Sequence, residues 1–233
     1  KGWEAAQPHL SSIDETIIAL AHNGTLVNFD NLRKELTTRN ISFRSDTDSE
    51  VAAQLIGYFT QKTHRLRSGI AATMHLIEGG YAMVLVRENA LYAFRDPHGI
   101  RPLVLGRLGS PEDNSWVVAS ETCALDIVGA TYIREVEPGE IIKISDDGLR
   151  SERGLTHRDP AACIFEDVYF SRPDSVVDGR SIYWVRHTMG RQLARETSID
   201  ADLVIGVPDS GVPAAEGFAA ELGIPFGTGL IKN

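Results

Sequence analysis

The sequence predicts an α+β first part that is followed by the beginning of an α/β domain. Two observations predict the first part: from about Ile17 to Ile144, short apolar runs alternate with polar turns, and amphipathic helical stripes interrupt them. A third observation predicts the second part. After residue 160 the pattern becomes an apolar strand, a tight loop, a helix and a further apolar run, which is the order of a parallel α/β unit.

Five short segments of the first part predict strands because they are rich in β-branched or aromatic residues. They are residues 17–21, 82–86, 91–94, 116–120 and 141–144. With the helices between them, these strands predict a mixed domain of layered antiparallel sheets and helices.

Two helical stripes lie between the first and second predicted strands. The first follows Thr47-Asp48-Ser49-Glu50, which has the spacing of a capping box, and consists of Val51, Leu55, Ile56 and Phe59. The second consists of Leu66, Ile70, Met74 and Ile77, and we expect Gly79-Gly80 to end that helix.

The segment 145–162 is polar and without periodicity, so it is either a surface crossing or a linker. Beyond it, one helix is predicted by the stripe Ile182, Val185, Met189, Leu193, and another by Val212, Ala215, Phe218, Ala219, Leu222. Residues 203–207 between them are continuously apolar, as buried parallel strands are. Asp167 lies in an otherwise apolar run, and we expect its carboxylate to reach solvent or a partner.

Composition and charge narrow the class of protein. The 233 residues carry a net charge of −9, which argues against binding to nucleic acid or to an anionic membrane surface. No apolar run approaches the roughly 20 residues of a membrane span, and the first ten residues lack the apolar core of a signal peptide. Two cysteines do not make a disulfide framework. We therefore expect a soluble, cytoplasmic protein.

The first candidate site is His22-Asn23-Gly24, which follows a predicted strand. Taken alone, Asn-Gly favours a tight turn because both residues tolerate positive φ. The functional alternative is an oxyanion hole, in which the Asn23 amide and the Gly24 backbone N–H donate to a developing oxyanion. Asp48 is either a first-turn carboxylate favoured by the helix dipole or an anchor for a substrate ammonium. His22 is as readily structural as functional.

The second candidate site is Pro208-Asp209-Ser210-Gly211, between a predicted strand and the helix after it. Ligands of open α/β sheets bind there, and helix N-termini hold phosphates. The loop lacks the glycine spacing of a Walker loop, so a plain turn and cap is an open alternative. Cys123 and Cys163 have no Cys or His neighbour at metal-ligand spacing, so we expect no self-contained zinc site.

Ordered motifs along the whole chain resemble the amidophosphoribosyltransferase family. Those in the first part are residues 3–8, 21–28, 45–50, 78–82, 95–103 and 119–124, and some of them are shared with other N-terminal-nucleophile amidotransferases. Residues 165–175 are more selective for this family, and 189–190, 207–211 and 229–233 continue the resemblance.

The resemblance implies a fold and a reaction. The fold is an N-terminal-nucleophile αββα sandwich over residues 1–160, a type-2 glutamine amidotransferase domain without its N-terminal part. A type I phosphoribosyltransferase parallel α/β domain begins at residues 161–233. The reaction converts phosphoribosylpyrophosphate and glutamine to 5-phosphoribosylamine, glutamate and pyrophosphate, the first step of de novo purine biosynthesis. The family further implies inhibition by purine nucleotides and a homotetramer.

The resemblance also implies roles for six residues. Asn23 and Gly24 match the oxyanion hole, and Asp48 matches the carboxylate that holds the glutamine amino group. Ser210 and Lys232 match positions that bind nucleotide or phosphate, and the Ser210 position is associated with Mg²⁺. Cys163 matches the first ligand of a [4Fe–4S] cluster in the iron–sulfur branch of the family.

Departures from the family pattern limit what this chain can do alone. The family nucleophile is a cysteine at the mature N-terminus, and the first residue here is Lys1. We therefore expect the nucleophile and the arginine that grips the glutamine carboxylate to precede Lys1, and the 233-residue chain to be inactive by itself. The alternatives are a truncated, non-catalytic relative that binds a nucleotide or a partner, and a hexosamine-forming amidotransferase. Residues 169–175 disfavour the latter.

Overall fold

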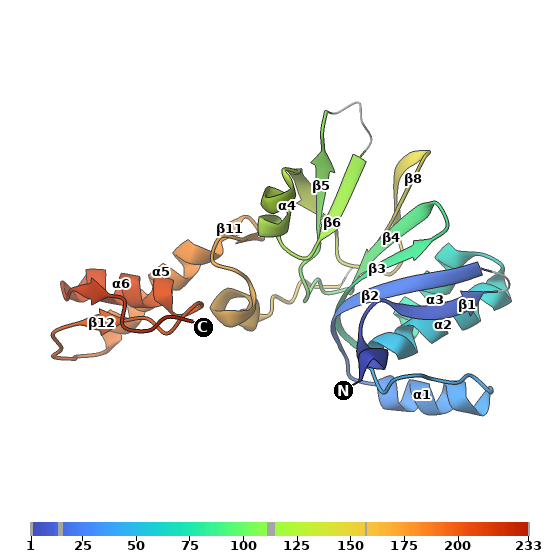
Figure 1. The fold of residues 1–233 in the computed structure, drawn as a ribbon, viewed down its shortest axis with the longest axis horizontal. Coiled ribbons are helices and arrows are strands. Elements are labelled where there is room, and N and C mark those ends of the chain that lie inside the picture. The colour runs from blue at the N-terminus through green and yellow to red at the C-terminus, as the bar shows by residue number, and fades with distance from the viewer. Residues whose placement is uncertain (1, 14–15, 111–114, 157, 233) are drawn as a thin grey trace. The chain divides into compact units, whose positions relative to one another are not determined.

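Two units make up the chain in the computed structural model, which describes residues 2–13, 16–110, 115–156 and 158–232 (Figure 1). Unit 1 comprises residues 1–120 and 131–162, and unit 2 comprises residues 121–130 and 163–233. The assignment of residues 1–160 and 161–233 to two enzyme domains stays a prediction. Among the described residues, no helix combines the length and the apolar character needed to cross a bilayer.

Unit 1 is built on a six-stranded antiparallel sheet in the order β1-β2-β3-β4-β8-β9. These strands are His9–Ile13, Thr16–Leu26, Gly79–Arg87, Ala90–Arg95, Glu140–Ser145 and Gly148–Arg153, in that order. A smaller antiparallel sheet has the order β6-β5-β7, with β5 at Val104–Leu108, β6 at Ser115–Ala119 and β7 at Thr131–Glu135. The five predicted strands are thus confirmed as β2, β3, β4, β6 and β8, with shifted ends.

Helices cover one face of the six-stranded sheet. They are α1 at Phe29–Thr38, α2 at Asp48–Thr63 and α3 at Leu66–Leu76 (Figure 1). Side chains alternate along β3, so Tyr81, Met83 and Leu85 pack with these helices in the main core. Ala82 points the other way and joins a second core with Leu105 of β5. Unit 1 therefore stacks a helical layer and two sheets, which agrees with the predicted layers.

Only one of the two hydrogen bonds of the capping box at the start of α2 forms. Thr47 Oγ1 accepts a hydrogen bond from Glu50 N at 3.3 Å, as predicted. The Glu50 carboxylate instead accepts from Arg44 N at 2.8 Å and Ser45 N at 2.6 Å. Burial alone would raise the pKa of Glu50, but these hydrogen bonds outweigh it and hold the pKa below its usual value. Glu50 thus fastens the loop before α2.

The prediction that Gly79-Gly80 ends α3 is wrong. The helix ends at Leu76, and both glycines begin β3. Gly79 has φ +135°, and a Cβ there would lie 2.1 Å from Thr25 O of β2. Close approach of two strand backbones, and not helix termination, therefore explains the glycine.

The interpretation of residues 145–162 as a surface crossing or linker is wrong for part of that segment. Gly148–Arg153 form β9, which pairs with β8 along its whole length. β9 is the edge strand and most of its side chains are exposed, so the apolar alternation that would have revealed a strand is missing.

Unit 2 begins a parallel α/β arrangement. Its elements are α4 at Thr122–Val128, a π-helix at Glu166–Phe170, β10 at Val176–Val177, β11 at Arg180–Ser181, α5 at Ile182–Glu196, β12 at Val204–Ile205, α6 at Val212–Leu222 and β13 at Phe226–Gly227. β12 and β13 pair in parallel, and α6 connects them. The predicted strand–loop–helix–strand order is confirmed, although the predicted strand 203–207 shortens to two residues.

Of the two surroundings expected for Asp167, solvent or a partner, the structure shows a partner. Asp167 lies in the π-helix with 6% of its surface exposed, and its Oδ2 is 3.4 Å from Arg180 Nη2. Its backbone carbonyl accepts from Nε of the buried Arg186 at 2.6 Å. The carboxylate in this apolar run is therefore paired.

Candidate functional site

His22, Asn23 and Gly24 lie inside β2 and not in a turn. β2 runs unbroken from Thr16 to Leu26, and its register with β3 places Asn23 opposite Ala82 and Gly24 opposite Tyr81. The turn interpretation of Asn-Gly is therefore wrong. Strand alternation points the His22 and Asn23 side chains to opposite faces of the sheet.

Gly24 is required by the closeness of β2 and β3. Its φ is +149°, and a Cβ built on it would lie 2.2 Å from Gly80 O and 2.8 Å from Tyr81 Cα. Both neighbouring atoms are backbone and cannot move aside cheaply. The position is thus restricted to glycine.

The Asn23 amide is held at both ends. Its Oδ1 accepts a hydrogen bond from Arg101 Nη2 at 2.6 Å, and its Nδ2 donates to Ser120 Oγ at 3.2 Å. Arg101 lies between β4 and β5, and Ser120 follows β6. Sequence reasoning missed both partners as site residues. Both lie in motifs quoted for the resemblance, residues 95–103 and 119–124, and that was the available signal.

Asp48 is the first residue of α2, and it reaches back to the end of β2. Its Oδ2 accepts from Leu26 N at 2.9 Å, and its Oδ1 accepts a long hydrogen bond of 3.4 Å from Ser49 Oγ. The Asp48 side chain is 21% exposed. The structure therefore brings Asp48 to the strand that carries Asn23 and Gly24. The partly exposed carboxylate can still accept a hydrogen bond from a ligand.

His22 links β2 to the start of α2. Its side chain is buried, with Nδ1 at 3.0 Å from Ser49 Oγ and 3.9 Å from Asp48 Oδ2. Burial lowers the pKa of His22 below its usual value, although the neighbouring Asp48 carboxylate acts in the opposite direction. The imidazole is therefore neutral at pH 7, and its Nε2 has no hydrogen-bond partner among the described residues.

Gln7 clamps β2 at His22. Its Oε1 accepts from His22 N at 2.5 Å, and its Nε2 donates to His22 O at 2.8 Å. The two hydrogen bonds imitate a further paired strand and fix the backbone directly before Asn23. Sequence reasoning did not single out Gln7, although it lies in the quoted motif 3–8.

Ser210 lies in the loop before α6, and Lys232 lies after β13, both in unit 2. Lys232 Nζ lies 3.0 Å from Asp209 Oδ2, so the ion pair brings Lys232 to the 208–211 loop. Ser210 lines a cavity of about 520 Å³ whose other walls are largely apolar. A carboxylate, a hydroxyl and an ammonium thus gather at the end of β12, where parallel sheets bind ligands.

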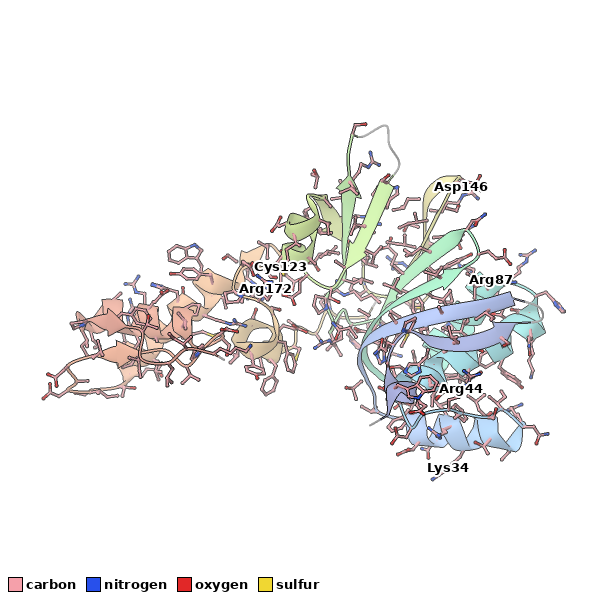
Figure 2. The ribbon with its side chains drawn as sticks, in the orientation of Figure 1. Lys34, Arg44, Arg87, Cys123, Asp146 and Arg172 are labelled. Carbon is pink, nitrogen blue, oxygen red and sulfur yellow. The ribbon has the colours of Figure 1, made fainter. Side chains whose placement is uncertain are left out.

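The two cysteines do not form a metal centre among the described residues, which hold no metal-ligating cluster of three or more His, Cys, Asp or Glu. Cys163 is a half-buried free thiol. Cys123 is buried, with Sγ 4.0 Å from Glu121 Oε2, which also accepts from Arg172 N at 2.8 Å (Figure 2). A [4Fe–4S] cluster takes four thiolates, so the two cysteines of this sequence do not supply its ligand set.

Comparisons with known proteins point to one family. The family model described as a glutamine amidotransferase domain matches residues 3–126. The amidophosphoribosyltransferase of Synechococcus elongatus is 46% identical over 228 residues, which are 98% of this chain and 46% of that protein. The amidophosphoribosyltransferase of Bacillus subtilis is 44% identical over 236 residues, which are 100% of this chain and 48% of that protein. The chain spans about half the length of these relatives.

A solved structure of the same family also matches this chain. The structure described as glutamine phosphoribosylpyrophosphate amidotransferase from B. subtilis, complexed with ADP and GMP, superposes with a TM-score of 0.89 at 44% sequence identity. The match covers 100% of this chain and 50% of that chain.

Proposed function

The chain belongs to the glutamine amidotransferase domain family and is an amidophosphoribosyltransferase homologue over nearly its whole length, and from this premise we propose that the whole protein transfers the amide nitrogen of glutamine to phosphoribosylpyrophosphate. The resemblance and the fold class that the sequence predicted are confirmed by these matches. The proposed reaction is the first step of purine biosynthesis.

The reaction has two balanced halves. Glutamine is hydrolysed to glutamate and ammonia, and ammonia then displaces pyrophosphate from C1 of phosphoribosylpyrophosphate to give 5-phosphoribosylamine. Amide hydrolysis needs donors for the oxyanion of the tetrahedral intermediate and an anchor for the zwitterionic substrate. The second half needs groups that hold phosphate and neutralise the leaving pyrophosphate.

The observation that carries the proposal is the hydrogen bond from Leu26 N to Asp48, which fastens that carboxylate to the strand that carries Asn23 and Gly24. Asn23 Nδ2 and the Gly24 backbone N–H are the oxyanion donors, placed side by side on one strand that Gln7 and β3 hold. Asp48 binds the α-ammonium of glutamine through its partly exposed carboxylate, which Leu26 N and Ser49 Oγ orient. An anchor and an oxyanion hole fixed to the same strand preserve their spacing when substrate binds.

Ser210 and Lys232 hold phosphate in the second half of the reaction. The Lys232 ammonium is exposed and pairs with Asp209, so it exchanges that partner for a phosphate at little cost. Oxygen donors suit Mg²⁺, and Ser210 Oγ with the Asp209 carboxylate offers them in this loop. Bound Mg²⁺ supplies charge neutralisation for the pyrophosphate group.

Further assignments rest on the family alone. They are a [4Fe–4S] cluster with Cys163 as one ligand, a homotetramer, inhibition by purine nucleotides and a cytoplasmic location. The cluster requires cysteines beyond the two in this sequence, and no step of the reaction runs through it. The B. subtilis structure is described with ADP and GMP bound, which supports the nucleotide assignment.

The test measures glutamate release by the full-length protein with and without phosphoribosylpyrophosphate. We expect release to depend on phosphoribosylpyrophosphate and to be matched by pyrophosphate. Release that ignores phosphoribosylpyrophosphate contradicts the proposed reaction, and binding of phosphoribosylpyrophosphate or nucleotide without any turnover supports the non-catalytic alternative instead.

A substitution tests the anchor. Asp48→Asn keeps the shape of the side chain and removes the charge, so we expect the KM for glutamine to rise by about tenfold or more with a smaller change in kcat. Asp30→Asn is the matched control, because Asp30 is an exposed carboxylate in the first turn of α1. An equal effect of both substitutions contradicts the role of Asp48.

A further inference from the structure

Asn23 meets a difficulty that every side-chain amide in an oxyanion hole meets. Its two ends have nearly the same shape and opposite hydrogen-bonding character. When Nδ2 faces the oxyanion, the amide donates a hydrogen bond and stabilises the negative charge. When Oδ1 faces the oxyanion, the two oxygens repel each other. The site therefore needs neighbours that distinguish the two ends.

Arg101 distinguishes them because a guanidinium only donates hydrogen bonds. Its Nη2 lies 2.6 Å from Asn23 Oδ1, and the reversed amide would set two donors against each other at that distance. Ser120 Oγ accepts one of the two Nδ2 hydrogens at 3.2 Å. The second Nδ2 hydrogen has no acceptor among the described residues and remains for a substrate oxygen.

The loop that carries Arg101 is held rigidly by Asp96. This fully buried carboxylate accepts from four backbone N–H groups, namely those of Tyr81 at 3.3 Å, His98 at 3.0 Å, Ile100 at 3.1 Å and Arg101 at 3.2 Å. Tyr81 lies opposite Gly24 in the sheet, so the same carboxylate ties the loop to the strand pair of the oxyanion hole.

Arg95 fixes the same loop from its other side. Its Nε donates to Arg101 O at 2.6 Å, and its Nη2 donates to Gly99 O at 2.8 Å. Nη1 of Arg95 reaches beyond the loop to Val136 O at 2.9 Å. The backbone of Arg101 is thus bound through both its N–H and its carbonyl, which leaves its side chain as the part of the loop directed at Asn23.

We propose that Arg101 and Ser120 are positioning residues that orient the Asn23 amide with Nδ2 toward the developing oxyanion. The proposal rests on the proposed function, because it concerns the glutaminase half of that reaction. Neither residue needs to contact substrate: both act through Asn23. In such a site the oxyanion donor is oriented before substrate binds. Donors stabilise a transition state most when they need no reorientation during the reaction.

The test uses the full-length protein and glutamine hydrolysis in the presence of phosphoribosylpyrophosphate. Arg101→Gln replaces a pure donor with an amide that donates or accepts, and Ser120→Ala removes the acceptor. We expect kcat to fall about tenfold or more for each, with the KM for glutamine changed by less than about threefold. Ser120→Thr retains the hydroxyl and is expected to retain activity.

A double-mutant cycle separates orientation of Asn23 from general damage. If Arg101 acts through Asn23, Arg101→Gln lowers kcat by less than about twofold further once Asn23→Ala is present. Arg67→Gln is the matched control, because Arg67 is a half-exposed arginine of the same unit, paired with Glu152. Phosphoribosylamine formation from added ammonia bypasses the glutaminase site, and we expect every variant to keep that activity.

The outcomes are distinct. Equal losses from Arg101→Gln with and without Asn23→Ala overturn the proposal, as does a rise in the KM for glutamine at unchanged kcat. If the Arg101→Gln protein does not fold, the proposal is tested with Ser120→Ala in a double-mutant cycle with Asn23→Ala, in which kcat is compared in the same way. Wild-type protein without phosphoribosylpyrophosphate-dependent glutamate release contradicts the proposed function itself, and this result is obtained before any variant is measured.

Discussion

Gly24 sets the tightest steric limit at the candidate site, and Gly24→Ala tests it. The new methyl group would lie 2.2 Å from Gly80 O, and φ +149° is strained for any L side chain. We expect the free energy of unfolding to fall by about 2 kcal/mol or more, because the clash adds to the backbone strain. Urea unfolding of the 233-residue chain measures it.

The control is Gly148→Ala. Gly148 also has positive φ, at +91°, but a Cβ there meets nothing within 4 Å. Only the backbone strain of about 1 kcal/mol should remain. Equal losses for the two substitutions would show that the approach of β2 to β3 is looser than described.

His22 gives unit 1 a pH-dependent stability. Burial lowers its pKa in the folded state, so between the usual value near 6.5 and that lower value the unfolded chain binds more protons. Stability from the neutral imidazole is therefore complete above about pH 6.5 and is lost as the pH falls toward the folded-state pKa. We expect His22→Asn to flatten the dependence of the free energy of unfolding on pH between about 7 and 5.

The same substitution at His75, an exposed residue near the end of α3, is the control and should leave the pH dependence unchanged. If His22→Asn and the wild-type chain lose stability in parallel over that range, other groups cause the acid sensitivity.

At the residue scale, the sequence predicted Asn23, Gly24 and Asp48 only through the family resemblance. Asn-Gly by itself favours a turn, and local propensity carries no information about a strand fixed by Gln7 and by β3. Arg101 and Ser120 lie 78 and 97 positions from Asn23. Contacts of such separation arise from sheet topology, which no local pattern encodes.

At the scale of elements, the α5–α6 pair shows what periodicity misses. The predicted stripe of α5 names a helix correctly, but the buried residues are Ile182, Arg186, Gly190 and Ala194. A Cβ on Gly190 would lie 1.8 Å from Ala214 O, and one on Gly217 2.0 Å from His187 O. The helices approach closely through their backbones at Gly190 and Gly217. Of the predicted stripe only Ile182 is fully buried, because the buried face of α5 also includes Arg186 and the small residues Gly190 and Ala194.

Gly190→Ala tests this contact. Alanine favours an isolated helix over glycine by up to about 1 kcal/mol, so a loosely packed α5 would gain stability. The clash with Ala214 O acts against that gain, and overpacking typically costs about 1–3 kcal/mol. We therefore expect a net loss, measured by thermal or urea unfolding. Thr188→Ala, on the exposed face of α5, should stay within about 0.5 kcal/mol of wild type.

In the six-stranded sheet, strand prediction succeeded where a strand has an apolar core face and failed at the edges. The central strands β2, β3, β4 and β8 were all predicted, whereas the edge strands β1 and β9 were not. Edge strands expose most of their side chains and keep charged residues there, as in β9. In the three-stranded sheet, β6 was predicted from its run Trp116-Val117-Val118, whereas β5 and β7, of the same five-residue length, were missed because Gly106, Arg107 and Arg134 interrupt their apolar runs.

At the scale of the whole molecule, the change from antiparallel layers to a parallel unit was predictable because the apolar pattern itself changes after residue 160. The membership of residues 121–130 in unit 2 was not predictable. α4 joins that unit through hydrogen bonds such as Val176 N to Thr122 Oγ1 at 2.8 Å and Ser175 Oγ to Glu121 Oε2 at 2.7 Å. These contacts span about 50 positions and involve polar groups, which hydrophobic patterns do not register.

The distribution of the core predicts unequal stability of the two units in the 233-residue chain. The main core of unit 1 joins three helices to four strands and includes fully buried Ile18, Leu20 and Tyr81. The buried apolar side chains of α5 and α6 are those of Ile182, Pro213 and two alanines, Ala194 and Ala219, while Phe226 of β13 is half-exposed. Apolar burial contributes about 25 cal/mol per Å², so unit 2 gains far less from it than unit 1.

Hydrogen exchange measured by mass spectrometry on the 233-residue chain tests this difference. We expect amides of β2, β3 and β4 to exchange only through global unfolding, and amides of β12, β13 and α6 to exchange through smaller, more frequent openings. Gly24→Ala provides the internal check, because it should accelerate exchange in β2 and β3 and leave α6 unchanged. Uniform protection of both units, or acceleration of α6 by Gly24→Ala, would mean that the two units unfold as one cooperative body despite their separate cores.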